Sequence, residues 1–355
     1  MKTEETAEQL SKSDVEAVDL IKQTYQRLLK ELGKTIVGQE RVVEEVFICI
    51  LTRSHAILEG VPGLAKTLLV STLAKCMKLE FNRIQFTPDL MPSDITGTEV
   101  IQENKSTGER AFRFLKGPIF ANLVLADEIN RTPPKTQAAL LEAMQERQVT
   151  TGGVRHAMLD PFFVLATQNP IEQEGTYPLP EAQQDRFMFK IVVDYPSIEE
   201  EKRVMRQTTG GSEQTVQPVI DGATLIALQQ TVRRIPASEH MIDYVARLVR
   251  ATRVTEKDIP DFVRDYVSWG AGPRACQCLI LAGKARAALR GRYHLAAEDV
   301  AAVARPALRH RIVTNFNADA DNMTTDRLIE KLVETVKAND SAIARDPEAK
   351  VLAKA

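Results

Sequence analysis

The sequence predicts an α/β protein in which a parallel sheet lies between helices, followed by a smaller region built only from helices. Short apolar segments alternate with helical patterns over the first 195 residues, which is typical of a parallel sheet covered on both faces. Several of these apolar segments end directly in polar residues. Beyond residue 195, apolar residues recur only at helical spacing. A length of 355 residues fits two such domains.

Composition excludes several classes of protein. With 44% hydrophobic and 26% charged residues, the chain resembles an ordinary globular protein. A net charge of −2 argues against nucleic acid as the main partner. No apolar run is long enough to predict a membrane-spanning helix, and the first residues lack the apolar centre of a signal peptide. Together with only four cysteines, these features predict a cytoplasmic location.

The chain divides into three predicted parts. The change in character at Asp194-Tyr-Pro196 places a boundary near 195, and Ser197 with Glu200 has the spacing of a capping box that begins a new helix. The predicted organisation is an N-terminal helical segment at 1–33, an α/β core at 34–195 with an insertion near 91–116 and a hairpin near 147–159, and a helical domain at 196–355 with a linker near 208–218.

The first predicted strand, residues 55–58, runs into a glycine-rich loop and then a helix, which is the context of a phosphate-binding loop. Gly60 and Gly63 let the backbone curl around phosphates, Lys66 would reach the β- and γ-phosphates, and the Thr67 hydroxyl would bind Mg²⁺. Ala65 stands where the general motif has its second glycine, so we expect helical φ and ψ angles there. By itself the loop would also fit a plain strand–turn–helix corner with a surface lysine.

Two further strands deliver polar residues to the same edge of the sheet. Residues 122–126 end in Asp127, a candidate ligand of Mg²⁺ directly or through water, and Glu128, a candidate for polarising the attacking water. Residues 162–166 lead to Asn169, whose amide could position that water or could simply form a turn before Pro170. Lys66 and Asp127 together favour a nucleotide site.

Two arginines lie outside these strands. Arg186 precedes the last predicted strand and would otherwise be a surface residue paired with Asp185 or Glu181. Arg274 opens a helix of the second domain, where an arginine could reach phosphates from a lid.

The segments GVPGLAKT, LVLADEIN, ATQNP, LPEAQQDRF and GAGPRA occur in this order, and together they resemble the AAA+ ATPases, specifically the MoxR type. The likeness extends from Ile36-Val-Gly-Gln39 to about Arg311 and includes the alanine before the lysine. It implies a P-loop NTPase core followed by an all-α lid. It also implies a homo-oligomer, usually a hexameric ring, that hydrolyses ATP with Mg²⁺ and acts on protein clients, often ones with von Willebrand factor A domains.

The resemblance also assigns roles residue by residue. Asp127 and Glu128 match Walker B, Asn169 matches sensor 1, Arg186 the arginine finger that serves the neighbouring subunit, and Arg274 sensor 2. The residues that it places at the nucleotide are Val37 and Gly38 beside the adenine and, in Walker A, Gly60, Val61, Pro62, Gly63, Leu64, Ala65, Lys66, Thr67 and Leu68.

Other interpretations stay open at this point. Relatives within the same branch could drive metal chelation or move along DNA, although the 147–159 hairpin offers only Arg147, Arg155 and His156 as basic residues. A scaffold locked around its nucleotide, with little turnover, is a third alternative. Within the insertion, Phe112, Phe114 and Leu115 could be exposed contact residues or could pack on the core.

Overall fold

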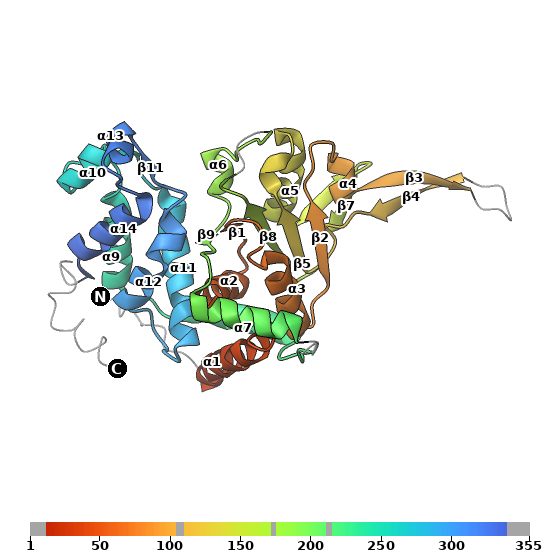
Figure 1. The fold of residues 1–355 in the computed structure, drawn as a ribbon, viewed down its shortest axis with the longest axis horizontal. Helices are drawn as coiled ribbons and strands as arrows, with labels where there is room; N and C mark the ends of the chain where they lie inside the picture. Colours follow the sequence, from red (N-terminus) through yellow and green to blue (C-terminus); the bar gives the residue numbers. More distant parts are fainter. Residues whose placement is uncertain (1–11, 104–109, 172–174, 211–214, 339–355) are drawn as a thin grey trace, which may run out of the picture.

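The computed structural model describes residues 12–103, 110–171, 175–210 and 215–338. Its centre is a parallel sheet of five strands in the order β2-β5-β8-β1-β9 (Figure 1). The sequence pattern missed β2, while the other four strands are confirmed. The strands are β1 (Ala56–Glu59), β2 (Phe81–Gln85), β5 (Leu123–Asp127), β8 (Phe163–Gln168) and β9 (Phe189–Val192).

Alternation along the central strands creates two separate cores. In β5, Leu123 and Leu125 face one core, whereas Val124 and Ala126 face the other. All four side chains are fully buried, as expected for a parallel strand covered on both faces. The continuous apolar run that predicted this strand is therefore explained by helices on each side of the sheet.

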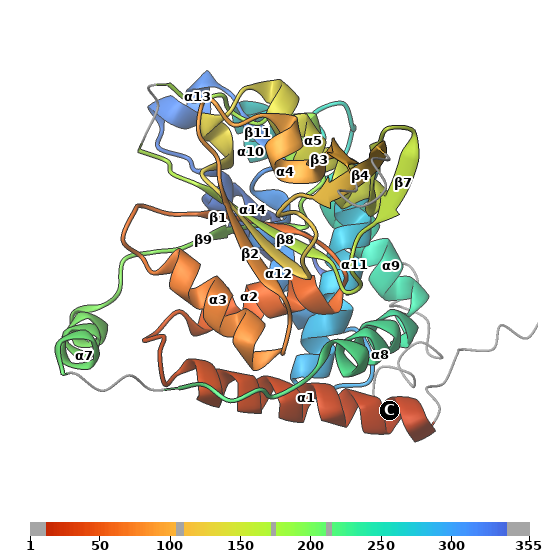
Figure 2. The ribbon, with the colours of Figure 1, turned by 90° about the vertical axis from the view of Figure 1, so that its right-hand side faces the viewer.

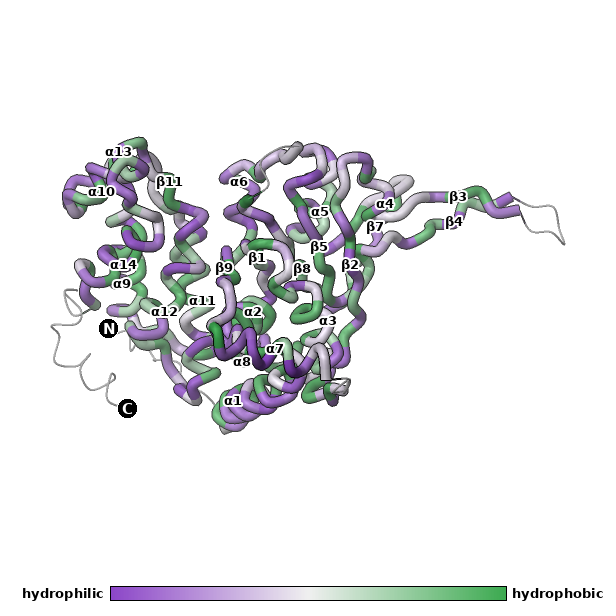
Figure 3. The backbone as a smooth tube through the Cα atoms, in the orientation of Figure 1, coloured by the Kyte–Doolittle hydropathy of each residue, from purple (hydrophilic) through white to green (hydrophobic). Residues whose placement is uncertain are grey.

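The two faces are covered by different helices. The first face packs against α2 (Glu40–Leu51) and α3 (Lys66–Cys76), with α1 (Lys12–Leu32) packed on α3 as an outer layer, and the second face packs against α5 (Pro134–Glu146). Figure 3 shows α2 as mostly hydrophobic, in keeping with its near-complete burial. Short helical segments connect these elements: α4 (Pro92–Thr96), η1 (Ile129–Arg131) and α6 (Glu181–Gln184).

Both predicted hairpins are present and they contact one another. The insertion forms β3 (Gly97–Glu103) and β4 (Arg110–Lys116), which project from the body as an arm (Figure 1), and the second hairpin is β6 (Gln148–Thr151) with β7 (Val154–Ala157). The Phe114 ring stacks on His156 with 3.9 Å between ring centroids. Phe114 thus packs inward, whereas Phe112 is 75% exposed. The polar tip at 104–109 lies outside the described residues.

The second half is mainly helical, but the expectation of helices alone was wrong. It contains a two-stranded antiparallel sheet in which Trp269 is opposite Val313. Strands this short carry too few residues to show a period of two. The elements are α7 (Ile198–Thr209), α8 (Gly222–Arg234), α9 (Glu239–Arg250), α10 (Asp261–Tyr266), β10 (Val267–Trp269), α11 (Pro273–Leu289), α12 (Ala297–Leu308), β11 (Val313–Thr314), α13 (Phe316–Ala320) and α14 (Thr325–Thr335).

The helical region packs along the outer edge of the sheet. Helix α12 lies beside β9, while α8 contacts both α1 and α2. Because α8 lies against helices of the N-terminal half, the predicted boundary near 195 stays a prediction. Among the described helices, none combines the length and apolar character needed to cross a bilayer.

Helix α7 differs from the other described helices of more than one turn because none of its residues is buried. It stands apart from the body of the molecule in Figure 2. Its start is nevertheless well defined: Ser197 accepts a hydrogen bond from the backbone N–H of Glu200, and the Glu200 carboxylate accepts one from the N–H of Ser197. The predicted capping box is therefore confirmed.

The backbone at Ala65 departs from expectation. Its φ of 54° and ψ of 24° place it in the left-handed region, not in the right-handed helical region that we predicted. The residue is the last before α3 begins at Lys66. An L-residue in this conformation brings Cβ close to the following carbonyl oxygen, which explains why glycine is usual at this position.

Replacing Ala65 with glycine is expected to stabilise the protein without ligand. The left-handed conformation destabilises the folded state by roughly 1–2 kcal/mol for a residue with Cβ, and glycine removes this strain. Glycine also raises the conformational entropy of the unfolded chain, which lowers the free energy of unfolding by about 0.4–1 kcal/mol. The expected net gain in the free energy of unfolding for Ala65→Gly is about 0.5–1 kcal/mol, measured by calorimetry. Ala74→Gly, in the buried interior of α3, should instead destabilise. A lower melting temperature for Ala65→Gly would contradict this account.

Candidate functional site

The glycine-rich loop lies between β1 and α3, at the carboxyl edge of the sheet. The Lys66 ammonium donates a hydrogen bond to the Gly60 carbonyl, which draws the side chain back along the loop. Gly63 has φ +87° and open space where a Cβ would stand, so the top of the loop is clear. Partial burial lowers the pKa of Lys66, against the opposing charges of Asp127 and Glu128. Lys66 is thus a half-buried lysine close to two carboxylates, and its ammonium is held by the loop backbone.

The two acids are joined by one hydroxyl group. Thr167, on β8, donates a hydrogen bond of 2.6 Å to Asp127 Oδ1 and accepts one of 2.8 Å from the backbone N–H of Glu128. Glu128 itself is left-handed, with φ 59° and ψ 48°. A non-glycine residue held in this region is typical of a functional site, because the surrounding contacts must maintain the strained conformation.

Sequence reasoning missed the polar residues of β2 that face these acids. Arg83 donates to Asp127 Oδ2 at 2.7 Å and 2.9 Å, and Gln85 donates to Glu128 Oε2 at 2.7 Å. Arg131 approaches the same Glu128 oxygen at 3.1 Å. The available signal was the spacing of Arg83 and Gln85, two residues apart on one strand. Such spacing puts side chains on one face, but it identifies a strand only when its pairing is known.

Asn169 lies in the same region, one residue beyond β8. It is buried, and its Oδ1 accepts a hydrogen bond of 3.1 Å from the backbone N–H of Ile171. The structure therefore confirms the turn-forming interpretation and also brings Asn169 to the carboxyl edge with Asp127 and Lys66. The two interpretations are compatible because the amide nitrogen is on the other arm of the side chain.

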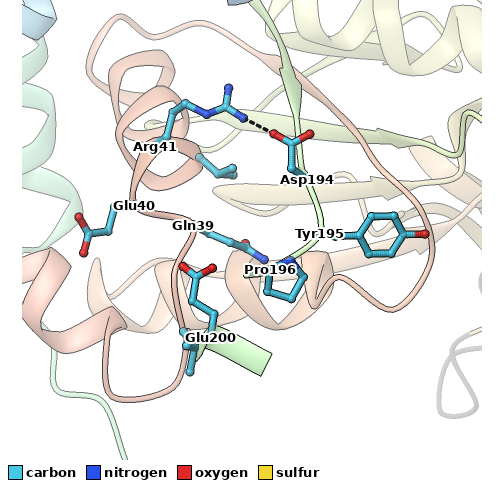
Figure 4. A pocket seen from close by; sticks show the side chains of 9 residues that line it. Gln39, Glu40, Arg41, Asp194, Tyr195, Pro196 and Glu200 are labelled. Atoms are coloured by element: carbon cyan, nitrogen blue, oxygen red, sulfur yellow. Dashed lines mark hydrogen bonds and ion pairs between the residues drawn. The ribbon is translucent and has the colours of Figure 1, made fainter. Parts of the chain in front are cut away.

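A cavity of about 190 Å³ lies next to the loop, between the start of α2 and the start of α7 (Figure 4). Val37 lines it, and a Cβ on Gly38 would collide with the Glu200 carboxylate. Gln39 connects the cavity to the loop, because its amide nitrogen donates to the Leu64 carbonyl at 3.1 Å. Of the two residues expected beside the base, Val37 thus lines a cavity that adjoins the phosphate loop, and Gly38 lies against Glu200, which also lines it.

The two predicted arginines lie near the amino ends of the strands, at the end of the sheet opposite to the phosphate loop. Strand β9 is parallel to β1, with Phe189 beside Ala56, so Arg186 precedes the amino end of its strand while the loop follows the carboxyl end of β1. Arg274 donates to Asp185 Oδ2 at 3.3 Å, so it lies beside the same segment. The structure therefore brings Arg186 and Arg274 together, but away from Lys66.

The alternative role of Arg186 as a local ion-pair partner is wrong within the described part of the chain. Asp185 pairs with Arg274 and with Arg311, whose guanidinium is 2.7 Å from Asp185 Oδ1. Arg186 is exposed, and its side chain makes no hydrogen bond or ion pair with any described residue. Its guanidinium is thus available to another molecule.

Arg309 and Arg147 have structural partners. Arg309 pairs with Asp326, and its guanidinium also donates to the Lys190 carbonyl. On the second hairpin, Arg147 donates to the Arg53 carbonyl at 2.9 Å, which leaves Arg155 as its exposed arginine. One exposed arginine gives little support for a hairpin that grips phosphates along DNA.

The chemistry of the donor set fits a nucleotide triphosphate with one divalent cation. The described residues contain no cluster of three or more His, Cys, Asp or Glu side chains able to hold a metal by themselves. Mg²⁺ is usually held by one or two carboxylates together with substrate phosphates and waters, which matches Asp127 and Thr67 beside an open loop. The loop, acids and adjoining cavity can accommodate phosphates, cation and base in that order.

Comparisons with known proteins agree with this geometry. Residues 55–189 match the family model "ATPase family associated with various cellular activities (AAA)", and 259–332 match the AAA lid domain. The chain is 44% identical to "Chaperone MoxR1" of Mycobacterium tuberculosis over 88% of its own length and 82% of that protein. It is 30% identical to "Protein MoxR" of Methylorubrum extorquens, covering 87% and 92% of the two chains.

A solved structure supports the same assignment. The crystal structure of a candidate ATPase from Cytophaga hutchinsonii superposes with a TM-score of 0.85 at 43% identity, covering 92% of this chain and 98% of that one. The family models span the phosphate loop, the paired acids and the lid helices described above. This chain therefore belongs to the MoxR-type AAA+ ATPases.

Proposed function

We propose that this protein is a Mg²⁺-dependent ATPase of the cytoplasm that assembles into a hexameric ring and uses ATP hydrolysis to remodel partner proteins. One observation carries the proposal: Lys66, Asp127 and Glu128 gather at the carboxyl end of the strands, while Arg186 lies at the amino end with no side-chain partner among the described residues. A nucleotide site of this composition is complete only when a second copy supplies the arginine. Membership of an ATPase family and similarity to named chaperones support it further.

The residues of the chain have separable tasks in this proposal. Lys66 would leave the Gly60 carbonyl and bind the β- and γ-phosphates, with the loop from Gly60 to Leu68 around them. Glu128 would polarise the attacking water once Gln85 and Arg131 release its carboxylate, and Asn169 would orient that water. Mg²⁺, when bound, would neutralise charge on the transferred phosphoryl group.

Asp127 is already engaged by Thr167 and Arg83 on both of its oxygens. We propose that it holds the Mg²⁺ through water, with Thr67 as the direct ligand, because direct coordination would require Arg83 to leave. The hydrogen bonds from Arg83 hold the carboxylate in one orientation, which a metal site of either kind needs.

The arm and the second hairpin are the proposed contacts with client protein. Ile101 and Phe112 are directly opposite each other on β3 and β4, and they are 63% and 75% exposed. Val154, on the neighbouring hairpin, is 54% exposed. Exposed apolar pairs on a projecting hairpin favour a protein client over DNA, and a partner with a von Willebrand factor A domain is the class that the family resemblance suggests.

Binding of ATP is expected to depend on Lys66. Lys66→Ala removes the cation that the loop supplies to the phosphates, so ATP affinity should fall by about 10- to 100-fold, measured by calorimetry. Lys75→Ala, on an exposed position at the end of the same helix, is the matched control and should bind as the parent does. Unchanged affinity in the Lys66 variant would show that the loop has been assigned wrongly.

Hydrolysis should be separable from binding at Glu128. Glu128→Gln keeps an oxygen for Gln85 and Arg131 but removes the negative charge, so ATP should still bind while the steady-state rate of phosphate release falls by about 10²–10⁴-fold. Glu142→Gln, on the exposed face of α5, makes the same chemical change as a control. Normal turnover in the Glu128 variant would exclude the proposed role.

Completion of the site by a neighbour can be tested by mixing variants. Arg186→Ala should bind ATP yet lose about 10³–10⁵-fold in rate, the range known for arginine fingers. Mixing it with Lys66→Ala should restore part of the activity, since mixed rings contain interfaces with both residues intact. Arg327→Ala, exposed on α14, should retain full activity alone. Specific activity that is independent of protein concentration, together with an inactive mixture, would contradict assembly.

A further inference from the structure

The cavity beside the phosphate loop carries a second observation, which concerns the side chain of Glu200. Its Oε2 accepts hydrogen bonds of 2.7 Å from both the N–H and the hydroxyl of Ser197. Its other oxygen, Oε1, lies close to Gly38 and accepts no hydrogen bond from any described residue, and Glu200 lines the cavity (Figure 4). One carboxylate thus caps α7 with one oxygen and offers the other to the cavity.

The other polar groups of the cavity are also acceptors or are already used. Arg41 donates to Asp194 at 3.0 Å, to the Val192 carbonyl and to Glu45. The Gln39 amide nitrogen is bound to Leu64, whereas its Oε1 is buried and has no hydrogen-bond partner among the described residues. The Tyr195 ring points away from the other lining residues in Figure 4. The side chains therefore leave acceptors free and donors occupied.

We propose that Glu200 selects adenine over purines that carry an oxygen at position 6. The exocyclic amino group of adenine is a hydrogen-bond donor, which complements the free Oε1 of Glu200. Hypoxanthine and guanine present a carbonyl oxygen at the same place, which a carboxylate repels. This inference rests on the nucleotide binding of the proposed function and adds the base specificity of that site.

The charge state of Glu200 suits this role. The N–H and hydroxyl of Ser197 donate to the carboxylate and lower its pKa, so the group is ionised at neutral pH and has no proton to donate. A buried or half-buried acceptor that meets another acceptor is left unpaired, which discriminates between ligands more strongly than a lost apolar contact does. Selection therefore follows from a mismatch of hydrogen-bonding groups.

The capping bonds make one substitution especially informative. In Glu200→Gln the two donors of Ser197 require the remaining side-chain oxygen at the Oε2 position, so the new amide nitrogen must take the Oε1 position above Gly38. Glutamine is as suitable as glutamate at this position of a capping box, so α7 keeps its start. The substitution thus converts the free acceptor into a donor at one place in the cavity.

The test measures the affinities of ADP and of inosine diphosphate by calorimetry, because neither depends on hydrolysis or on the arginines. The parent should prefer ADP by about tenfold or more, and Glu200→Gln should lower that ratio by about tenfold or reverse it. Glu199→Gln, one residue earlier and 77% exposed, makes the same change in charge outside the cavity and should keep the parent's ratio.

Each other outcome overturns the inference in a distinct way. Equal binding of the two diphosphates by the parent would remove base selection but leave the proposed ATPase intact. The parent's ratio in Glu200→Gln, or an equal shift in Glu199→Gln, would show that Glu200 acts only as a helix cap. If the parent bound neither diphosphate, the proposed function itself would fail. Melting curves of both variants distinguish altered recognition from loss of folding.

Discussion

The attachment of the helical region to the sheet depends on one buried guanidinium, that of Arg311. Its side chain is only 2% exposed. It donates to the Asp185 carboxylate and to the carbonyls of Asp185, Phe187 and Met188, which form the segment that leads into β9. A buried charge is tolerated only with a full set of partners, and removing one partner typically costs about 3–5 kcal/mol. The position of Arg186 relative to the lid is therefore set by Arg311.

The interaction between Arg311 and Asp185 also fixes the relative positions of Arg186 and Arg274. Asp185 receives Arg311 on one oxygen and Arg274 on the other, so the arginine of the lid and the exposed Arg186 share one anchor. His310 adds a contact to the Phe187 carbonyl, and its burial, together with the neighbouring Arg311, lowers its pKa well below the usual value. The contacts of Arg309, His310 and Arg311 thus hold the helical region against β9 and the segment that leads into it.

Much of the fold and part of the site could be predicted because they rest on local patterns. A strand, a glycine-rich loop and a helix are contiguous, so the place of Lys66 follows from sequence alone. The continuous apolar run before Asp127 likewise identifies a central strand. Strand β2 is different, because it is an edge strand of mixed polarity whose partner is 42 positions away in register, Phe81 beside Leu123. Only that pairing shows that Arg83 and Gln85 lie beside the acids at the end of β5.

Other features could not be predicted because they are set by tertiary contacts. The left-handed angles of Ala65 and Glu128 are imposed by the loop and by Thr167, whereas the residue types alone favour right-handed backbone. Trp269, on β10, is 72% exposed, although tryptophan is highly buried on average in folded proteins, so residue type alone does not predict its surface position. The pairing of Asp185 with Arg274 and Arg311, which lie 89 and 126 positions later in the chain, could not be predicted either.

The exposure of helix α7 links the occupancy of the cavity to the stability of the helix. A twelve-residue helix without tertiary burial is near the limit of stability in water, so its folded population is set largely by its first turn. That turn is held by Ser197 and Glu200, and Glu200 also borders the cavity. Any ligand that fixes Glu200 therefore raises the helical population of α7, and amide hydrogen exchange along the helix becomes a reporter of cavity occupancy.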